Sequence, residues 1–263
     1  MHAFPTWKIS DNDMLNIDLA SFLAIVVTCL VIFILARLAV RNLSVTNPSK
    51  VQNFMEWIVE FVQGVIANTQ DFKKGKIYLS LATTLILFIF VSNLIGLPLD
   101  ITTEHHEPLS AFGYDIVSQE DIDHGIAEGH EGAEVSWWKS PTADLSVTAG
   151  LAATIFAVIH FEGLRRNRKH YLKHYFKPFW FFFPINILET LAKPLTLALR
   201  LYANIYAGEV LIATILGAGI YGIPLMIVWQ GFSLFVAAIQ AFLFTILTMV
   251  YIAGSTIHDE EHA

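Results

Sequence analysis

Two very long apolar runs close this sequence, and they constrain its fold more than any other feature. The first run covers residues 179–220 and the second covers 223–257, and no polar, turn-rich stretch divides either of them. A helix of about forty residues would be about 60 Å long, twice the roughly 30 Å thickness of bilayer hydrocarbon. Either each run breaks into two spans, with Pro184 and Pro194 able to kink the first, or each run is one steeply tilted helix. The absence of turn signals favours two long tilted helices.

Three shorter apolar runs have the length of ordinary membrane spans, about twenty residues. They cover residues 17–40, 77–97 and 143–161. Only 15% of the residues are charged, against about a quarter in a soluble domain, and 55% are hydrophobic, which excludes a single water-soluble core. We therefore expect residues 1–263 to form one all-α polytopic membrane domain with about five membrane-crossing helices. The polar segment 1–16 does not resemble a cleaved signal peptide, so we expect the first run to be retained.

Residues 51–72 form a different kind of helix. Its apolar residues fall on one face at 100° per residue, and Gln, Asn and Glu side chains fall on the other. The apolar face comprises Val51, Phe54, Met55, Ile58, Val62, Val65 and Ile66, and the polar face comprises Gln52, Asn53, Glu56, Glu60, Gln63 and Gln70. With two glutamates inside it, this segment is predicted to be an interfacial amphipathic helix rather than a span.

The distribution of charge predicts how the chain crosses the membrane. Basic residues gather after the first span, before the second and in the loop 162–178, and the segment 98–142 is acidic. All three basic groups fall on one side, which the positive-inside rule assigns to the cytoplasm. We expect the segments 1–16 and 98–142 outside and the tail 258–263 in the cytoplasm. The net charge of −7 belongs largely to the acidic loop and gives no indication of a nucleic-acid partner.

A stripe of polar residues follows one side of the 179–220 helix within an arc of about 80°. It comprises Asn186, Glu189, Lys193, Thr196, Arg200 and Asn204. Glu189 and Lys193 have the spacing of an ion pair, whether functional or structural. Arg200 has no acidic residue three or four positions away, lies about twenty residues from either end of its run, and cannot lose its proton. Because an arginine at mid-membrane costs at least about 2.5–3.5 kcal/mol, a functional role is favoured over snorkelling.

Further polar residues extend this pattern. Glu209 lies nine residues after Arg200, about 180° around the helix and roughly 13 Å along it, so it can line a different aqueous cavity. The last helix carries a second stripe within another arc of about 80°: Gln230, Ser233, Gln240, Tyr251 and Ser255. Asp144, at the outer start of its span, fits either an outer entrance or a helix N-cap.

The segments that carry these residues resemble a known family, subunit a of bacterial F-type ATP synthases. PLTLALRLYANIYAGEV (194–210) resembles the family signature, and IQAFLFTILTMVYI (239–252) resembles its last helix. SNLIGL (92–97) and PTADLSVT (141–148) also match, in the family's order and spacing. The resemblance covers nearly the whole chain, and the segment around Arg200 is highly specific.

The resemblance implies a stationary subunit that offers two offset half-channels to ion-binding carboxylates on a rotating ring of c-type subunits. Arg200 matches the essential arginine that separates the half-channels, and Asn204 and Gln240 match its polar neighbours. Glu209 matches an acid of the outer half-channel, and Ser233 replaces a histidine that some members have opposite that acid. Glu189 would line the inner half-channel, and Tyr251 would belong to the same pathway.

The resemblance also implies partners and a location. The partners are the c-type ring, peripheral-stalk b subunits, the lipid bilayer and, indirectly, the catalytic head of the synthase. The implied location is the bacterial inner membrane, and the implied role is proton translocation for ATP synthesis, without enzymatic chemistry or a cofactor in this chain.

Two other functions were weighed against this one. A secondary transporter with an anionic substrate at Arg200 predicts discontinuous helices and two related halves, and neither is visible in the sequence. An intramembrane enzyme needs a nucleophile or a metal set, and the spacing of the histidines at 105, 106, 124, 130, 258 and 262 fits no ligand motif. We therefore expect no metal site.

Overall fold

The computed structural model describes residues 6–7, 17–96, 102–111, 114–117, 119–127, 132–138, 140–174, 179–217 and 219–256. Helices dominate, as predicted for an all-α polytopic membrane protein. Four helical stretches of the described chain are long and apolar enough to cross a membrane: Leu19–Arg41, Phe72–Gly96, Leu145–Arg165 and Gly222–Ser255. A fifth long helix, Phe183–Leu216, carries four charged residues.

The described elements follow one another along the chain as helices and short strands. They are β1 (Thr6–Trp7), β2 (Ile17–Asp18), α1 (Leu19–Arg41), α2 (Lys50–Thr69), α3 (Phe72–Gly75), η2 (Lys76–Tyr78), α4 (Leu79–Gly96), β3 (Thr102–His105), β4 (Leu109–Ala111), β5 (Tyr114–Val117), α5 (Gln119–Ala127), β6 (Ala133–Ser136), η3 (Pro141–Ala143), α6 (Leu145–His174), η4 (Trp180–Phe182), α7 (Phe183–Leu216), η5 (Gly219–Tyr221) and α8 (Gly222–Thr256).

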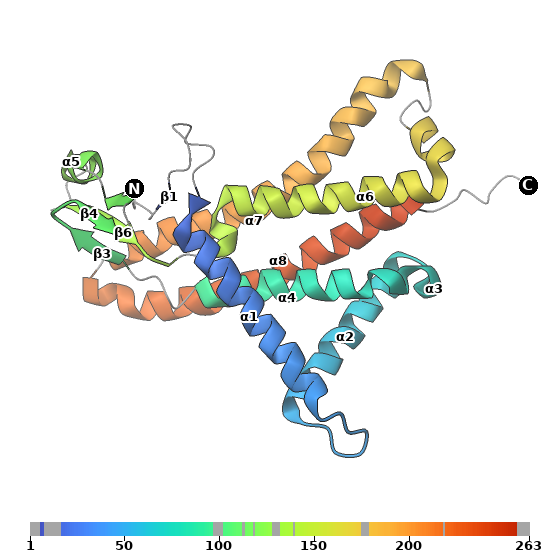
Figure 1. The fold of residues 1–263 in the computed structure, drawn as a ribbon, viewed down its shortest axis with the longest axis horizontal. Helices are drawn as coiled ribbons and strands as arrows, with labels where there is room; N and C mark the ends of the chain where they lie inside the picture. Colours follow the sequence, from blue (N-terminus) through green and yellow to red (C-terminus); the bar gives the residue numbers. More distant parts are fainter. Residues whose placement is uncertain are drawn as a thin grey trace, which may run out of the picture.

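The last two helices, α7 and α8, are the longest in the described chain. Helix α7 has 34 residues and continues through Pro184 and Pro194, and α8 has 35 residues. Each is therefore a single helix of about 50 Å, longer than bilayer hydrocarbon is thick. Helix α8 packs against α2, α4, α6 and α7, so it is the central element of the bundle (Figure 1).

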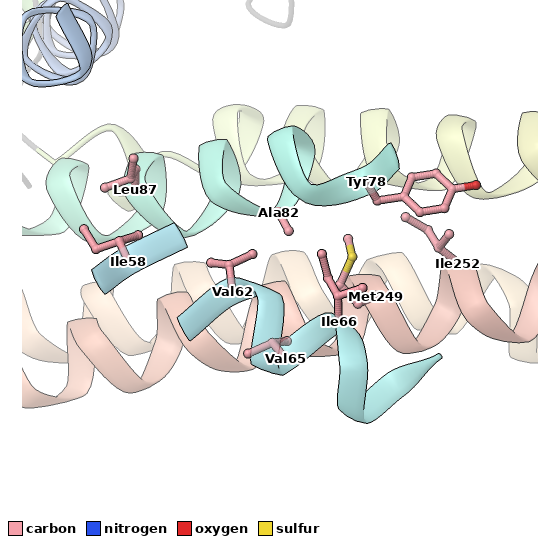
Figure 2. Close-up of a cluster of buried hydrophobic side chains, with 9 residues drawn as sticks. All are labelled: Ile58, Val62, Val65, Ile66, Tyr78, Ala82, Leu87, Met249 and Ile252. Carbon is pink, nitrogen blue, oxygen red and sulfur yellow. The ribbon is translucent and has the colours of Figure 1, made fainter. Parts of the chain in front are cut away.

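The largest apolar core lies where α2 meets α4 and α8. Ile58, Val62, Val65 and Ile66 of α2 are buried against α4 and against Met249 and Ile252 of α8 (Figure 2). Four of the seven residues predicted for the apolar face of this helix therefore pack onto the bundle. The bundle therefore covers part of the apolar face of α2, and the interfacial placement of this helix stays a prediction.

Two residues of α2 differ from their predicted face. Gln52, expected on the polar side, is buried, and its amide donates to the carbonyl of Ser44 at 3.0 Å and to Glu56 at 2.8 Å. It therefore fixes the connection between α1 and α2. Phe54, expected on the apolar face, is exposed and stacks on Trp57, which stacks in turn on Phe61, with centroids 6.4 and 6.2 Å apart. The face that the bundle covers is narrower than the apolar face of the helix, because this aromatic row points away from the core.

Helix α6 extends further than its predicted span. The expected span ends at residue 161 and a basic loop is expected over 162–178, but the helix continues to His174. No proline occurs between Leu145 and Lys177, and arginine, lysine and leucine are good helix formers. Most of the basic segment is therefore helical.

The acidic segment between α4 and α6 contains more structure than a loop. Strand β3 pairs with β6 and β4 pairs with β5, both antiparallel, and Val117 and Ile122 form a small core beside Trp137. These strands lie at the end of the bundle where α7 joins α8 (Figure 1). Short stretches rich in Thr, Tyr and Val form strands readily, despite the acidic residues around them.

Candidate functional site

Helices α7 and α8 form an antiparallel hairpin with a tight connection. Gly219 in η5 has φ 61°, a left-handed conformation that glycine adopts without strain. Gly222 opens α8 so close to the end of α7 that an added Cβ would lie 2.3 Å from the carbonyl oxygen of Ile215. Both glycines therefore allow the two long helices to turn back on each other.

Arg200 lies at the middle of α7. It follows the first residue, Phe183, by seventeen positions and precedes the last, Leu216, by sixteen, so each end is about 25 Å away. Its side chain is exposed on the surface of the chain, and it forms no ion pair with any side chain that the structure describes. If α7 crosses a membrane, this guanidinium lies at mid-bilayer, where a counter-charge is strongly favoured.

Several small side chains lie on the exposed face of α7 that carries Arg200, together with Leu211. Thr196, Ala203, Ala207 and Thr214 are exposed and lie within about 60° of Arg200 around the helix axis. The opposite side of α7 includes Ala198, which is buried against the bundle. Arg200 therefore faces away from its own bundle, on a surface that allows another helix to approach closely.

Three other predicted residues of α7 are placed by their backbone alone. Asn204 lies one turn after Arg200 on the same face, and Glu189 lies three turns before it on nearly the same face. Glu209 lies nine residues after Arg200, about half a turn around the axis. The side chains of Glu189, Asn204 and Glu209 lie outside the part of the chain that the structure describes.

The predicted residues of α8 share one face of that helix. Gln240 is 6% exposed, and Ser233 and Tyr251 are half-buried. Their spacing places all three within about 20° of one another around the axis. At one end of this face, Tyr251 packs against the apolar cluster that α8 shares with α4 and α6.

Asp144 connects α1 and α6 at the end of the bundle where both helices begin. One carboxylate oxygen accepts from the backbone N–H of Ser146 at 2.8 Å and from its hydroxyl at 2.6 Å, so Asp144 caps the start of α6. The other oxygen accepts from the hydroxyl of Ser21 in α1 at 3.1 Å. These bonds confirm that Asp144 is a helix N-cap. The preceding residue, Ala143, is the last residue of η3, and η3 contacts α7.

A buried polar cluster lies beside Asp144, and sequence reasoning did not identify it. Asn93 of α4 accepts from the hydroxyls of Thr142 and Ser140, and Ser140 also donates to the carbonyl of Ser92 at 3.3 Å. This cluster holds η3 against α4, while η3 also packs on α1, α6 and α7. An asparagine inside an apolar run was the available signal.

The histidines of the acidic segment do not form a metal site in the described residues. His105 shares a hydrogen bond of 2.9 Å with Thr103 and lies edge-on to Trp137. No group of three or more His, Cys, Asp or Glu side chains that could hold a metal ion occurs in the described residues.

Comparison with known proteins gives one consistent result. The family model described as ATP synthase A chain matches residues 21–253. Proteins named ATP synthase subunit a are similar along nearly their whole length. The protein of Anoxybacillus flavithermus is 42% identical over 254 residues, covering 93% of this chain and 94% of its own. The protein of Bacillus subtilis is 41% identical over 261 residues, covering 93% of this chain and 95% of its own.

Proposed function

The chain belongs to the family of ATP synthase subunit a, and on that premise we propose that it is the stationary ion-translocating subunit of an F-type ATP synthase. The observation that carries the proposal is the exposed Arg200 at the middle of α7, which has no counter-charge among the described side chains of its own chain. An arginine cannot lose its proton to become neutral in the membrane. Its counter-charge therefore comes from a partner, a ring of c-type subunits that carries carboxylates at mid-membrane.

The positive charge gives Arg200 its function. A ring carboxylate that arrives opposite the guanidinium is held in its ionised form, because a nearby positive charge favours that form. The carboxylate therefore releases its proton on one side of Arg200 and regains one on the other. The same charge repels protons and prevents a direct leak between the two half-channels.

The remaining predicted residues divide between these half-channels. Glu209, Ser233 and Asp144 serve the outer one, Glu189 and Tyr251 serve the inner one, and Asn204 and Gln240 flank Arg200. Each proton that crosses gains about 2.3 kcal/mol per 100 mV, so several crossings are needed for each ATP. This chain performs no phosphoryl chemistry itself, and peripheral-stalk b subunits hold it still relative to the catalytic head.

The proposal includes a location and an orientation. The protein lies in the bacterial inner membrane, with the acidic segment and the N-terminus outside and the C-terminus in the cytoplasm. Helix α2 lies at the cytoplasmic interface, where the aromatic row of Phe54, Trp57 and Phe61 suits the headgroup region.

The decisive test is Arg200→Ala in the complete complex reconstituted into vesicles. We expect ATP-driven acidification to vanish and passive proton leak to persist or rise, while the complex stays assembled. Arg168→Ala, which removes an exposed arginine of α6, is the matched control and should pump normally. Pumping by Arg200→Ala at wild-type rate would reject the rotary role and favour a transporter with an anionic substrate at this arginine.

A further inference from the structure

Trp229 lies on the same face of α8 as the predicted pathway residues. It precedes Ser233 by four positions, Gln240 by eleven and Tyr251 by twenty-two, which places all four within about 40° around the helix axis. Its position is the outermost of the four, nearest to the connection with α7. Trp229 directly precedes Gln230, the first residue of the polar stripe predicted for α8, so it lies at the end of that stripe nearest the connection.

The indole N–H of Trp229 is buried and has no acceptor among the described residues. The ring itself packs against Phe232, with centroids 5.3 Å apart. Two buried hydroxyls of α8 are satisfied within the helix, since Thr245 and Thr248 donate to the carbonyls of Ala241 and Phe244 at 2.8 Å. A buried donor without a partner is destabilising, so native proteins almost always supply an acceptor, often an ordered water.

The depth of Trp229 in the hairpin matches that of Glu209. Trp229 follows the first residue of α8 by seven positions, and Glu209 precedes the last residue of α7 by seven. Because the two helices are antiparallel and in contact, both positions lie about 10 Å from the connected ends. By the same measure Gln240 lies near the depth of Arg200. The face from Trp229 to Gln240 thus runs from the level of Glu209 to the level of Arg200.

We propose that Trp229 is a positioning residue of the outer half-channel, whose indole N–H holds a water molecule at the depth of Glu209. The inference rests on the proposed function. The indole donates only and does not titrate, so it carries no proton itself. A water molecule that accepts a hydrogen bond from the indole N–H can donate both of its own hydrogens, one to a carboxylate and one to the next water. Ser233, one turn deeper, both donates and accepts and can continue this chain without titrating.

The alternative role of Trp229, an anchor at the membrane interface, does not explain why its indole N–H is buried. Tryptophans at a membrane interface place the apolar ring among lipids and the N–H in the headgroup region. The Nε1 atom of Trp229 is instead buried within the protein. Trp57, by contrast, is 62% exposed on α2 and suits the anchor role.

The first experiment removes only the N–H. Trp229→Phe keeps an aromatic ring, and we expect ATP-driven acidification by the complete complex to fall by roughly 5- to 30-fold, since a lost hydrogen bond of about 1–2 kcal/mol corresponds to that factor. Trp57→Phe makes the same change on the exposed surface of α2 and should leave pumping unchanged. Pumping by Trp229→Phe at the rate of this control would overturn the proposal.

The second experiment detects water directly and does not depend on pumping. In a Cys29→Ser background, Trp229→Cys and Phe232→Cys each remove one ring of the same aromatic pair, and Phe232 is the more exposed of the two side chains. Silver ion reacts with the thiolate, which forms where water reaches the thiol. We expect modification at 229 to be at least tenfold faster than at 232. Equal rates would overturn the proposal even if Trp229→Phe pumps poorly. If the proposed rotary function is wrong, Arg200→Ala will pump normally. That result does not change the difference in silver reaction rate between positions 229 and 232, so the two failures can be distinguished.

Discussion

The phenol of Tyr78 donates a hydrogen bond of 2.9 Å to the carboxylate of Glu162, which lies 84 positions further along the chain. Both residues are buried, with 5% and 8% of their surface exposed. The bond joins the start of the second span to the end of the third, beside the apolar core that α2 and α8 share. Arg165 lies 4.0 Å from the same carboxylate but is largely exposed, so it contributes little.

The contribution of this hydrogen bond to stability can be measured by removing the phenol hydroxyl of Tyr78. We expect Tyr78→Phe to lower the unfolding free energy by about 1–3 kcal/mol, since it removes a hydrogen bond from a buried carboxyl group. Denaturant titration of the purified protein in detergent measures this change. In Tyr78→Phe/Glu162→Leu the loss should be smaller than the sum of the single changes, because neither partner is left unsatisfied. Additive losses would show that the two groups do not depend on each other.

Gly96, at the end of α4, is predicted to tolerate no larger residue. A Cβ there would lie 2.4 Å from the Cβ and 2.8 Å from the Cα of Ser140, so the backbone before η3 would have to move. We expect Gly96→Ala to lower stability by about 1–3 kcal/mol, the usual effect of overpacking. It should also weaken the Asn93–Thr142–Ser140 cluster.

Gly150→Ala is the matched control for this change. Gly150 lies inside α6, and an added Cβ would meet nothing within 4 Å. Alanine is favoured over glycine in a helix by about 1 kcal/mol, so this variant should be neutral or stabilised. The two variants can be compared by thermal unfolding in the same detergent. Equal stability of the two would mean that η3 moves away from α4 without loss.

The sequence predicts the membrane helices well because the bilayer imposes a length that is visible in composition. The helices α1, α4 and α8 begin and end within two residues of the apolar runs that predict them. Arg200 is equally visible, since a charge in such a run is costly wherever the helix packs. These features depend on local sequence and on the solvent, so no knowledge of tertiary contacts is needed.

Other features depend on contacts between distant segments, and these contacts cannot be predicted from the local sequence. The bond between Tyr78 and Glu162 requires two helices to meet in one register. The buried N–H of Trp229 becomes unusual only once its surroundings are known. The helical continuation of α6 to His174 is not predicted by the sequence, because a basic segment after a span is typical both of a connection and of a helix that leaves the membrane.

The orientation of the chain can be tested by labelling exposed positions on the two sides. In a Cys29→Ser background, Ser110→Cys in β4 and Lys74→Cys in α3 each place a thiol at an exposed position outside the spans predicted from the sequence, 17–40, 77–97 and 143–161. We expect a membrane-impermeant maleimide to label residue 110 in spheroplasts and residue 74 only in inverted vesicles. The physical reason is the positive-inside rule, which places the basic clusters in the cytoplasm. The reverse pattern would invert the proposed topology and exchange the inner and outer half-channels.

The small exposed residues around Arg200 give a test of the surface that faces the ring. Ala203→Leu adds bulk less than one turn from Arg200, where close approach of a partner helix is proposed. We expect ATP-driven acidification to fall at least tenfold, because the guanidinium can no longer approach the ring carboxylates closely. Ala153→Leu makes the same change at an exposed position of α6 and should have little effect. Comparing both variants in reconstituted vesicles, with ring retention checked by native electrophoresis, separates a blocked contact from failed assembly. Normal pumping by Ala203→Leu would mean that this face of α7 does not contact the ring.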